Sequence, residues 1–293
     1  MTIRLIIYPG VVLARVMKFT RQESLERLRE TVSNGEPIVG AGAGTGISAK
    51  FAERGGIDLL IIYNSGRYRM NGRGSLAGLL PYGDANEIVL DMGHQVLPVV
   101  EDTPVLAGVN GTDPFRDMEV FIAELKHRGF SGVQNFPTVG LFEEGTQFRA
   151  NIEETGMGYD KEVDMIQEAS EQGMLTCPYV FTEEEAREMT EAGADVVVSH
   201  MGLTTSGDIG AETALDLETA AERVQAHHDA VTEVNEDAMV ICHGGPIAWP
   251  EDAQYVLDNT DGVVGFFGAS SLERLPTEQA IEQQARDFKE MDL

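Results

Sequence analysis

The chain has 293 residues, 42 % of them hydrophobic, which is enough for one large α/β domain or two small ones. It carries 49 acidic against 21 basic residues, a formal net charge of -28. This charge argues against a protein that binds nucleic acid through a basic face or binds anionic membrane surfaces. An excess of acidic residues of this size is typical of salt-adapted proteins. We therefore expect stability and activity to rise with salt concentration.

The two ends of the chain differ in their pattern. Residues 1–16 are mildly apolar but contain Pro9 and Gly10, and they lack a recognisable signal-peptide cleavage site. We expect an N-terminal extension over 1–16 and one domain over 17–293. No apolar run approaches the ~20 residues that a membrane span needs. Cys177 and Cys242 stand alone in apolar runs, which predicts buried thiols in a reducing compartment and hence a cytoplasmic protein.

Helices are predicted where an N-cap residue precedes apolar residues at helical spacing. Capping boxes at Thr20 and Thr182 begin two of them. Asp113, followed by proline, predicts another, with Phe115 on its buried face. Further helices are expected to begin near Asp84, Asp160, Asp216, Pro250 and Thr277.

Short apolar runs of strand length lie between these helices. Most are nearly continuous in apolar residues, as parallel strands covered on both faces require. The eight predicted strands are 38–43, 59–63, 105–109, 132–136, 175–180, 195–199, 239–243 and 263–267. Alternating β/α units in this number predict a single-domain (β/α)₈ barrel of the α/β class, with an open doubly wound sheet as the alternative.

The long connection after the second predicted strand is basic and rich in glycine. Residues 64–74 read NSGRYRMNGRG, with Arg67, Arg69 and Arg73 as the cations. Arginine offers a planar fork that grips carboxylate or phosphate, and glycine lets backbone N–H groups approach a ligand closely. In so acidic a chain this loop predicts a site for a small anionic ligand. The alternative is that the arginines pair with the protein's own carboxylates.

In a barrel, the carboxyl ends of the strands carry the active site. His200 and His243 end two predicted strands and are closely followed by glycine, which suits general acid–base groups or metal ligands. A buried histidine bonded to the backbone is the alternative for each. Asn64, Asn110 and Asn135 stand at other strand ends and would orient a ligand.

Other candidates depend more on context. Asp113 could ligate a metal, although its place before a proline also suits a helix cap. Glu154 lies in a long loop just before two glycines and could move a proton, although exposed glutamates are usually only solvated. Ser270 and Ser271 follow the last strand, where barrels often bind phosphate through backbone N–H groups. An ordinary helix cap is the alternative for these serines.

Nucleotide-binding motifs are missing. The glycine string over residues 40–46 lacks the G-x-G-x-x-G spacing, and Asn64 rather than an acidic residue follows the next strand. The sequence has no Walker motif, nucleophile elbow or zinc spacing. No nucleotide cofactor is therefore expected.

Several segments carry a family signature: 38–46, 63–83, 106–115, 132–140, 154–159, 200–204, 242–246 and 268–277. Together they resemble the phosphoenolpyruvate hydrolase-like family, also called TIM-barrel signal transduction proteins, over residue 17 to the end. This family looks like a branch of the phosphoenolpyruvate mutase and isocitrate lyase-type barrels. The resemblance implies a homo-oligomeric barrel, 2-oxo acids or enol phosphates as ligands, and Mg²⁺ as cofactor.

The chain departs from the better understood members of that superfamily. They carry an Asp-x-Asp metal pair after the third strand and a Glu after the fourth. The corresponding ends here, 110–113 and 135–138, read NGTD and NFPT. The cysteine-containing loop of the lyases is absent too.

These observations predict an enzyme that acts on a small phosphorylated or phosphono 2-oxo acid through an enolate-like intermediate. The arginines would hold its anionic groups, the serines its phosphate, and the two histidines would move protons. Asp113 or Glu154 would reach a magnesium ion. A C–C lyase or ester hydrolase on a related 2-oxo acid, and a non-enzymatic ligand-sensing barrel, are the alternatives.

Overall fold

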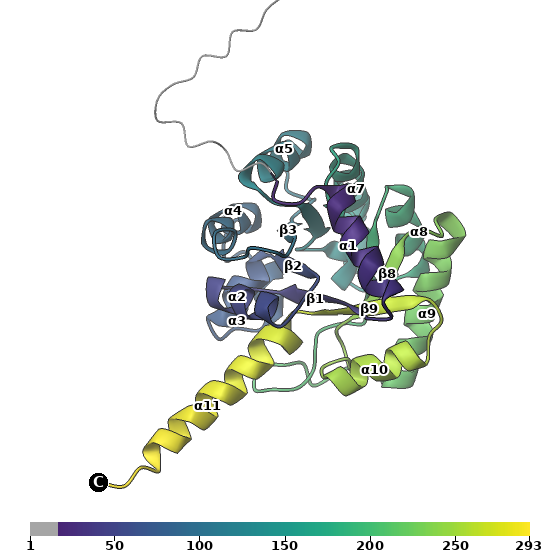
Figure 1. Ribbon diagram of the computed structural model, residues 1–293. Helices are drawn as coiled ribbons and strands as arrows, with labels where there is room; N and C mark the ends of the chain where they lie inside the picture. The colour runs from purple at the N-terminus through teal and green to yellow at the C-terminus, as the bar shows by residue number, and fades with distance from the viewer. Residues whose placement is uncertain (1–16) are drawn as a thin grey trace, which may run out of the picture.

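Parallel strands form the centre of the molecule, as Figure 1 shows for the computed structural model. The structure describes residues 17–293, so the predicted extension over 1–16 lies outside the described part. The strands are β1 (Ile38–Gly42), β2 (Leu59–Ile62), β3 (Val105–Val109), β4 (Gly132–Asn135), β5 (Leu175–Thr176), β6 (Tyr179–Val180), β7 (Val196–His200), β8 (Met239–His243) and β9 (Val263–Gly268). Their order in the sheet is β5-β4-β3-β2-β1-β9-β8-β7-β6.

Pro178 divides the fifth predicted strand into β5 and β6, because proline has no N–H to give to a ladder. Hydrogen bonds nevertheless continue on both sides of it. The N–H of Cys177 donates to the carbonyl of Val133 at 3.0 Å, and that of Val198 donates to the carbonyl of Pro178 at 2.8 Å. β5 and β6, which stand at the two ends of the strand order, are therefore two halves of one strand. Counted this way, eight strands close the barrel, and the predicted (β/α)₈ fold is confirmed.

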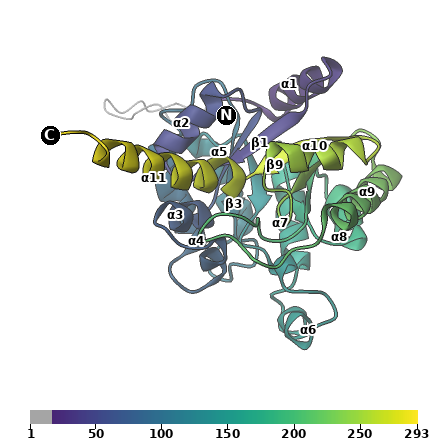
Figure 2. The same cartoon turned by 90° about the horizontal axis from the view of Figure 1, so that it is seen from below.

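Helices surround this barrel, whose β2 and β3 are buried along their whole length. The helices are α1 (Arg21–Ser33), α2 (Gly46–Arg54), α3 (Asn64–Met70), α4 (Ala85–Val96), α5 (Met118–Arg128), α6 (Gln147–Glu154), α7 (Asp160–Glu171), α8 (Glu183–Glu191), α9 (Leu217–Val234), α10 (Pro250–Asp258) and α11 (Leu275–Lys289). Three short turns, η1 (Ser75–Leu79), η2 (Val139–Leu141) and the π-helical η3 (Ser270–Arg274), follow strands β2, β4 and β9. α6 and α11 project from the barrel (Figure 2).

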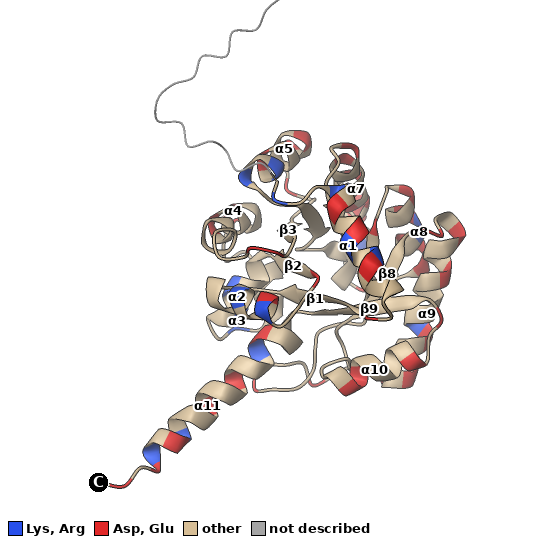
Figure 3. Cartoon of the chain, viewed as in Figure 1, with Lys and Arg blue, Asp and Glu red and all other residues tan. Residues whose placement is uncertain are grey.

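Acidic residues are spread over the helices around the barrel (Figure 3). No helix in the described part of the chain is long and apolar enough to cross a membrane.

Some predicted elements need correction. The helix predicted from Asp113 begins at Met118, where the side chain of Asp117 accepts the N–H of Val120, and Phe115 is 95 % exposed instead of buried. The last helix begins at Leu275 and not at Thr277, because η3 runs directly into it.

The basic segment after β2 was predicted as a loop and is helical instead. Residues Asn64–Met70 form α3, which starts directly after an extended Tyr63. Seven residues with a central glycine give too short a pattern for helical spacing to show.

A buried polar cluster braces the barrel where Pro178 interrupts the ladder. The Nδ2 of Asn135 donates to Glu162 Oε2 at 2.6 Å and to the carbonyl of Tyr179 at 3.2 Å, while its Oδ1 accepts the N–H of Tyr179 at 2.7 Å. The N–H of Val139 donates to Glu162 Oε1 at 2.7 Å. The amide of Asn135 thus replaces part of the missing strand pairing. Burial raises the pKa of Glu162 from 4.5 to about 8.

We expect Glu162 to make stability depend on pH. The folded chain keeps a proton on this carboxyl that the unfolded chain loses, so the stabilising effect is full below pH 4.5 and is lost as the pH rises to about 8. Denaturant unfolding of wild type and Glu162→Gln across this range checks it. The wild type should lose stability relative to the variant as the pH rises, and parallel profiles would contradict the assignment.

Candidate active site at the barrel mouth

A cavity of about 40 Å³ lies at the carboxyl ends of the strands, the side where (β/α)₈ barrels place their active sites. Five aromatic side chains contribute to its lining: Tyr63, Phe136, Tyr179, His200 and His243. Leu76 of η1 and the segment after β7 also border it. The space suits one or a few waters, so a ligand of several atoms requires the covering segments to move.

His200 and His243 lie side by side in this cavity. The register of β7 and β8 pairs the two residues, and their ring centroids are 4.6 Å apart. The Nδ1 of His200 accepts the N–H of Gly202 at 3.0 Å, so a neutral ring carries its proton on Nε2. The Nδ1 of His243 lies 2.7 Å from the carbonyl oxygen of Phe267, so it must donate, and Nε2 keeps the lone pair. The pair offers one proton donor and one proton acceptor.

Both imidazoles are neutral near pH 7. Burial lowers the pKa of His200 well below 6.5, and the neighbouring His243 adds to the shift. Burial also lowers the pKa of His243 to about 4; its bond to Phe267 opposes the shift, and the charge of Arg69 adds to it. An anion bound between the rings would raise both pKa values by stabilising the imidazolium form.

A buried ion pair stands beside the mouth and joins α3 to η3. The Nε and Nη2 of Arg69 donate to Glu273 Oε2 at 3.2 and 2.9 Å, and each side chain is 1 % exposed. The other oxygen of Glu273 accepts the N–H of Gly44 and the hydroxyl of Ser48. The Nη1 of Arg69 is buried and has no hydrogen-bond partner among residues 17–293. Arg69 itself does not line the mouth, but Tyr63 does, and its ring centroid lies 5.5 Å from the Arg69 Cζ. The unpaired Nη1 suits an anion that reaches past Tyr63.

The other two arginines of the basic segment turn away from the mouth. Arg67 pairs with Asp91, as the alternative for this segment predicts, and Arg73 is exposed and donates to the carbonyl of Gly72. Of the three predicted anion-binding arginines, the structure brings only Arg69 close to the histidines.

The predicted asparagines occupy different places. The side-chain amide of Asn135 is fully used in the brace against Glu162 and Tyr179. Asn110 lines a second cavity on the same face, together with Asp113. Asn64 donates to the carbonyl of Gly78 at 2.8 Å, and its Oδ1 is buried without a partner in the described chain.

Ser270 lines the mouth, and the hydroxyl of Ser271 is buried with no partner within the described range. Both belong to η3, and π-helical turns are rare and concentrate at functional sites. The same turn supplies Glu273 and Arg274, which sequence reasoning missed although they lie in the family signature over 268–277. Arg274 lines the mouth and donates to the carbonyl of Ser206 at 2.9 Å.

Glu154 lies far from this constellation. It ends α6, is exposed, and accepts a bond from Asn151 at 3.2 Å. α6 stands out from the barrel in Figure 2.

The donors at the mouth do not fit a magnesium ion held by the protein. Mg²⁺ prefers carboxylate and water oxygens, whereas the mouth offers imidazoles and phenols. The carboxylate of Asp113 is already bonded to Asn86, Arg116 and the N–H of Phe115. Among residues 17–293, no three His, Cys, Asp or Glu side chains lie together as metal ligands.

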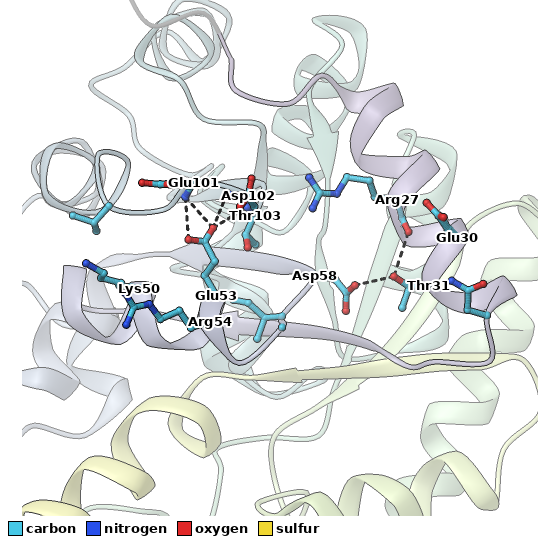
Figure 4. A pocket seen from close by; sticks show the side chains of 14 residues that line it. Arg27, Glu30, Thr31, Lys50, Glu53, Arg54, Asp58, Glu101, Asp102 and Thr103 are labelled. Atoms are coloured by element: carbon cyan, nitrogen blue, oxygen red, sulfur yellow. Dashed lines mark hydrogen bonds between the residues drawn. The ribbon is translucent and has the colours of Figure 1, made fainter.

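A cavity of about 640 Å³ at the opposite end of the barrel lies between α1, α2 and the loop before β3 (Figure 4). Its central carboxylates serve the fold. Glu53 accepts the N–H groups of Glu101, Asp102 and Thr103, and Asp58 accepts the hydroxyl of Thr31. This end of a barrel usually serves stability, which favours the mouth as the site.

We expect the two charges of this ion pair to depend on each other for stability. Arg69→Met leaves Glu273 buried without a counter-charge, so the free energy of unfolding should fall by about 3–5 kcal/mol. The double variant Arg69→Met/Glu273→Met buries no charge and should recover much of this loss. Denaturant unfolding measures both, and additive losses would contradict a coupled pair.

The chain is similar to known proteins in both sequence and fold. It matches the model of the phosphoenolpyruvate hydrolase-like family over residues 23–291. It is 60 % identical over 269 residues to the ToMV susceptible protein tm-1(GCR26) and, to the same extent, to the ToMV resistance protein Tm-1(GCR237), both of Solanum lycopersicum. Each match covers 92 % of this chain and 35 % of the tomato protein.

A putative transcriptional regulatory protein, y4pA of Sinorhizobium fredii, is 35 % identical over 273 residues, which are 92 % of this chain and 44 % of that protein. The chain thus spans less than half the length of these curated relatives.

Solved structures share the barrel. A putative lyase/mutase from Burkholderia cenocepacia has a TM-score of 0.58 at 14 % identity, covering 91 % of this chain and 88 % of that one. An oxaloacetate acetylhydrolase has a TM-score of 0.57 at 16 % identity, covering 92 % and 88 %. A phosphonopyruvate hydrolase, in complex with oxalate and Mg²⁺, has a TM-score of 0.53 at 14 % identity, covering 90 % and 87 %. At identities this low, the likeness shows that the fold is shared and nothing more. The family match confirms the resemblance read from the sequence: the chain belongs to the phosphoenolpyruvate hydrolase-like family.

Proposed function

We propose that the protein is a hydrolase or lyase that acts on a small anionic 2-oxo acid or its phosphorylated or phosphono derivative. The observation that carries this proposal is the pair His200 and His243, a neutral proton donor and acceptor in one aromatic cavity. The free edge of Arg69 supplies a positive group beside it. The names of the solved relatives, phosphonopyruvate hydrolase and oxaloacetate acetylhydrolase, support the same substrate class.

The geometry suggests roles for these groups in a hydrolysis. The Nη1 of Arg69 holds the carboxylate of the substrate. The Nε2 of His243 takes a proton from the attacking water as its oxygen bonds to phosphorus. The bond from phosphorus to the enol oxygen breaks, the Nε2–H of neutral His200 stabilises the departing enolate by a hydrogen bond, and the enolate takes its proton from solvent. His243 releases the proton that it took from the water to solvent and is neutral again, and Ser270 lines the space beside the phosphoryl group.

We assign no step to a metal ion. The solved phosphonopyruvate hydrolase binds Mg²⁺ with oxalate, but here Asp113 and Glu154 lie outside the mouth. A C–C lyase or ester hydrolase would use the same histidine pair on a related 2-oxo acid.

A ligand-sensing barrel without turnover is the second candidate. No Asp or Glu lines the mouth in the described part of the chain. This favours the sensor, because carboxylates are common general acids and bases in enzymes. The name of y4pA, a putative transcriptional regulator, points in the same direction.

Phosphorus NMR of the purified protein with phosphoenolpyruvate and then phosphonopyruvate tests the first candidate. We expect phosphate release, and we expect His243→Ala to slow it by ~10²-fold because the general base is lost. His127→Ala, which removes an exposed histidine on α5, is the matched control and should leave the rate unchanged. Undiminished turnover in His243→Ala would contradict the assignment, whereas binding without any reaction would favour the sensor.

We also propose that the protein self-associates through α11. Of the 15 residues of this helix only Leu275 is buried, and Ile281 and Phe288 are exposed on the projecting part. An apolar cavity of about 640 Å³, bordered by Ile47 and Phe51 of α2, lies at its base. A second copy could cover both surfaces at once.

Sedimentation equilibrium checks this proposal. The wild type should sediment as an oligomer and the double variant Ile281→Asp/Phe288→Asp as a monomer, because two buried charges would oppose the contact. Val120→Asp, at an equally exposed apolar residue of α5, should change nothing. A monomeric wild type would contradict the proposal.

A reducing, cytoplasmic location is likewise proposed. Cys177 and Cys242 are buried free thiols, and burial raises the pKa of Cys242 to about 12. Adaptation to salt is proposed from the net charge of -28 and from the acidic residues spread over the helices in Figure 3.

A further inference from the structure

A second cavity lies beside the mouth, on the same face of the barrel. Its volume is about 580 Å³. The lining is mainly apolar and includes Leu79, Leu80, Pro114, Pro137, Val139 and Phe142. Two carboxylates, those of Asp84 and Asp113, also border it, and both are paired with Arg116. The cavity therefore suits an uncharged group.

The turn η1 forms a wall between the two cavities. Leu76 of η1 borders the mouth, and Leu79 of the same turn borders the second cavity. Gly78 lies between them, where an added Cβ would come within 3.2 Å of the Phe136 ring and 2.1 Å of Ser65 Oγ. Only a residue without a side chain fits there, because η1 packs closely against Ser65 and Phe136 at this point.

An unsatisfied polar atom lies against this wall, on α3. Asn64 is 2 % exposed, and its Oδ1 has no hydrogen-bond partner within the described residues. A Cβ added at Gly78 would lie 2.9 Å from this oxygen. A buried acceptor without a partner costs free energy, and movement of η1 would expose it to water or ligand.

Few bonds hold η1 in place. The hydroxyl of Ser65 donates to the carbonyl of Ser75 at 2.6 Å, and the amide of Asn64 donates to that of Gly78 at 2.8 Å. The preceding Gly72 has a φ of 73°, which only glycine adopts readily, so the chain can turn there. The proposed movement of η1 away from the mouth must break these two side-chain bonds and the close packing of Gly78 on α3.

Exposed apolar side chains rim the second cavity. Phe115 is 95 % exposed and Leu80 is 50 % exposed, and both line it. Phe115 buries almost nothing, so it does not serve folding. Exposed apolar groups beside a candidate site indicate contact with a ligand.

We propose that the two cavities are halves of one substrate site, and that the substrate is a 2-oxo acid with an apolar substituent of several carbons. Its anionic end lies between the histidines near Arg69, as in the proposed function on which this inference rests. Its apolar end lies in the second cavity when η1 has lifted. A compact acid such as pyruvate occupies the mouth alone.

Titration calorimetry with straight-chain 2-oxo acids, from pyruvate to 2-oxooctanoate, tests the inference through binding. Affinity should rise about fourfold for each added methylene until the cavity is filled. Leu80→Asp and Phe115→Asp should weaken the longest acid about tenfold or more and leave pyruvate unchanged. Val120→Asp, which places the same charge on α5, is the matched control.

The outcomes separate the two proposals. Affinity that is flat along the series, or an equal loss in Val120→Asp, would overturn the extended site and leave the proposed function standing if pyruvate binds. Absence of binding for every acid would overturn the extended site, and phosphate release in the phosphorus NMR experiment would then decide the proposed function separately.

Discussion

The buried pair between Arg69 and Glu273 is the interaction on which the mouth depends. It connects the helix after β2 to the π-helical turn after β9, and Glu273 also holds Gly44 after β1. Well-packed apolar residues often stabilise a core as well as a buried ion pair does, so stability alone does not explain it. Its position beside the histidines and the free Nη1 of Arg69 suggest that it holds a positive edge ready for an anion.

Parallel strand register brings the other half of the site together. Because β7 and β8 pair in register, His200 and His243 are placed side by side at adjacent strand ends. Each ring is then fixed by a different backbone group, the N–H of Gly202 for one and the carbonyl of Phe267 for the other. Two side chains of the same type thereby acquire opposite roles: Nε2 is the donor in His200 and the acceptor in His243. The aromatic surroundings keep both neutral, and a bound anion changes that balance.

The sequence predicts the barrel and both histidines because these signals are local. Apolar runs locate the strands, and strand ends locate His200 and His243. Which carboxylate each arginine contacts cannot be predicted from local sequence. Arg69 pairs with Glu273, 204 positions away, in the interior, whereas Arg67 pairs with Asp91 at the surface. The start of α5 was missed for a different, local reason: Asp113 and Asp117 both offer a cap, and the helix uses Asp117. The buried Glu162 and the two cavities divided by η1 follow from packing, which no spacing pattern reports.

The central claim is that the mouth holds two neutral imidazoles of opposite tautomer. NMR titration of histidine labelled with ¹⁵N measures it directly. We expect His243 to protonate only near pH 4, with the proton of neutral His200 on Nε2 and that of His243 on Nδ1, and we expect oxalate to raise both pKa values. Titration of both rings near 6.5, or the same tautomer in each, would contradict it.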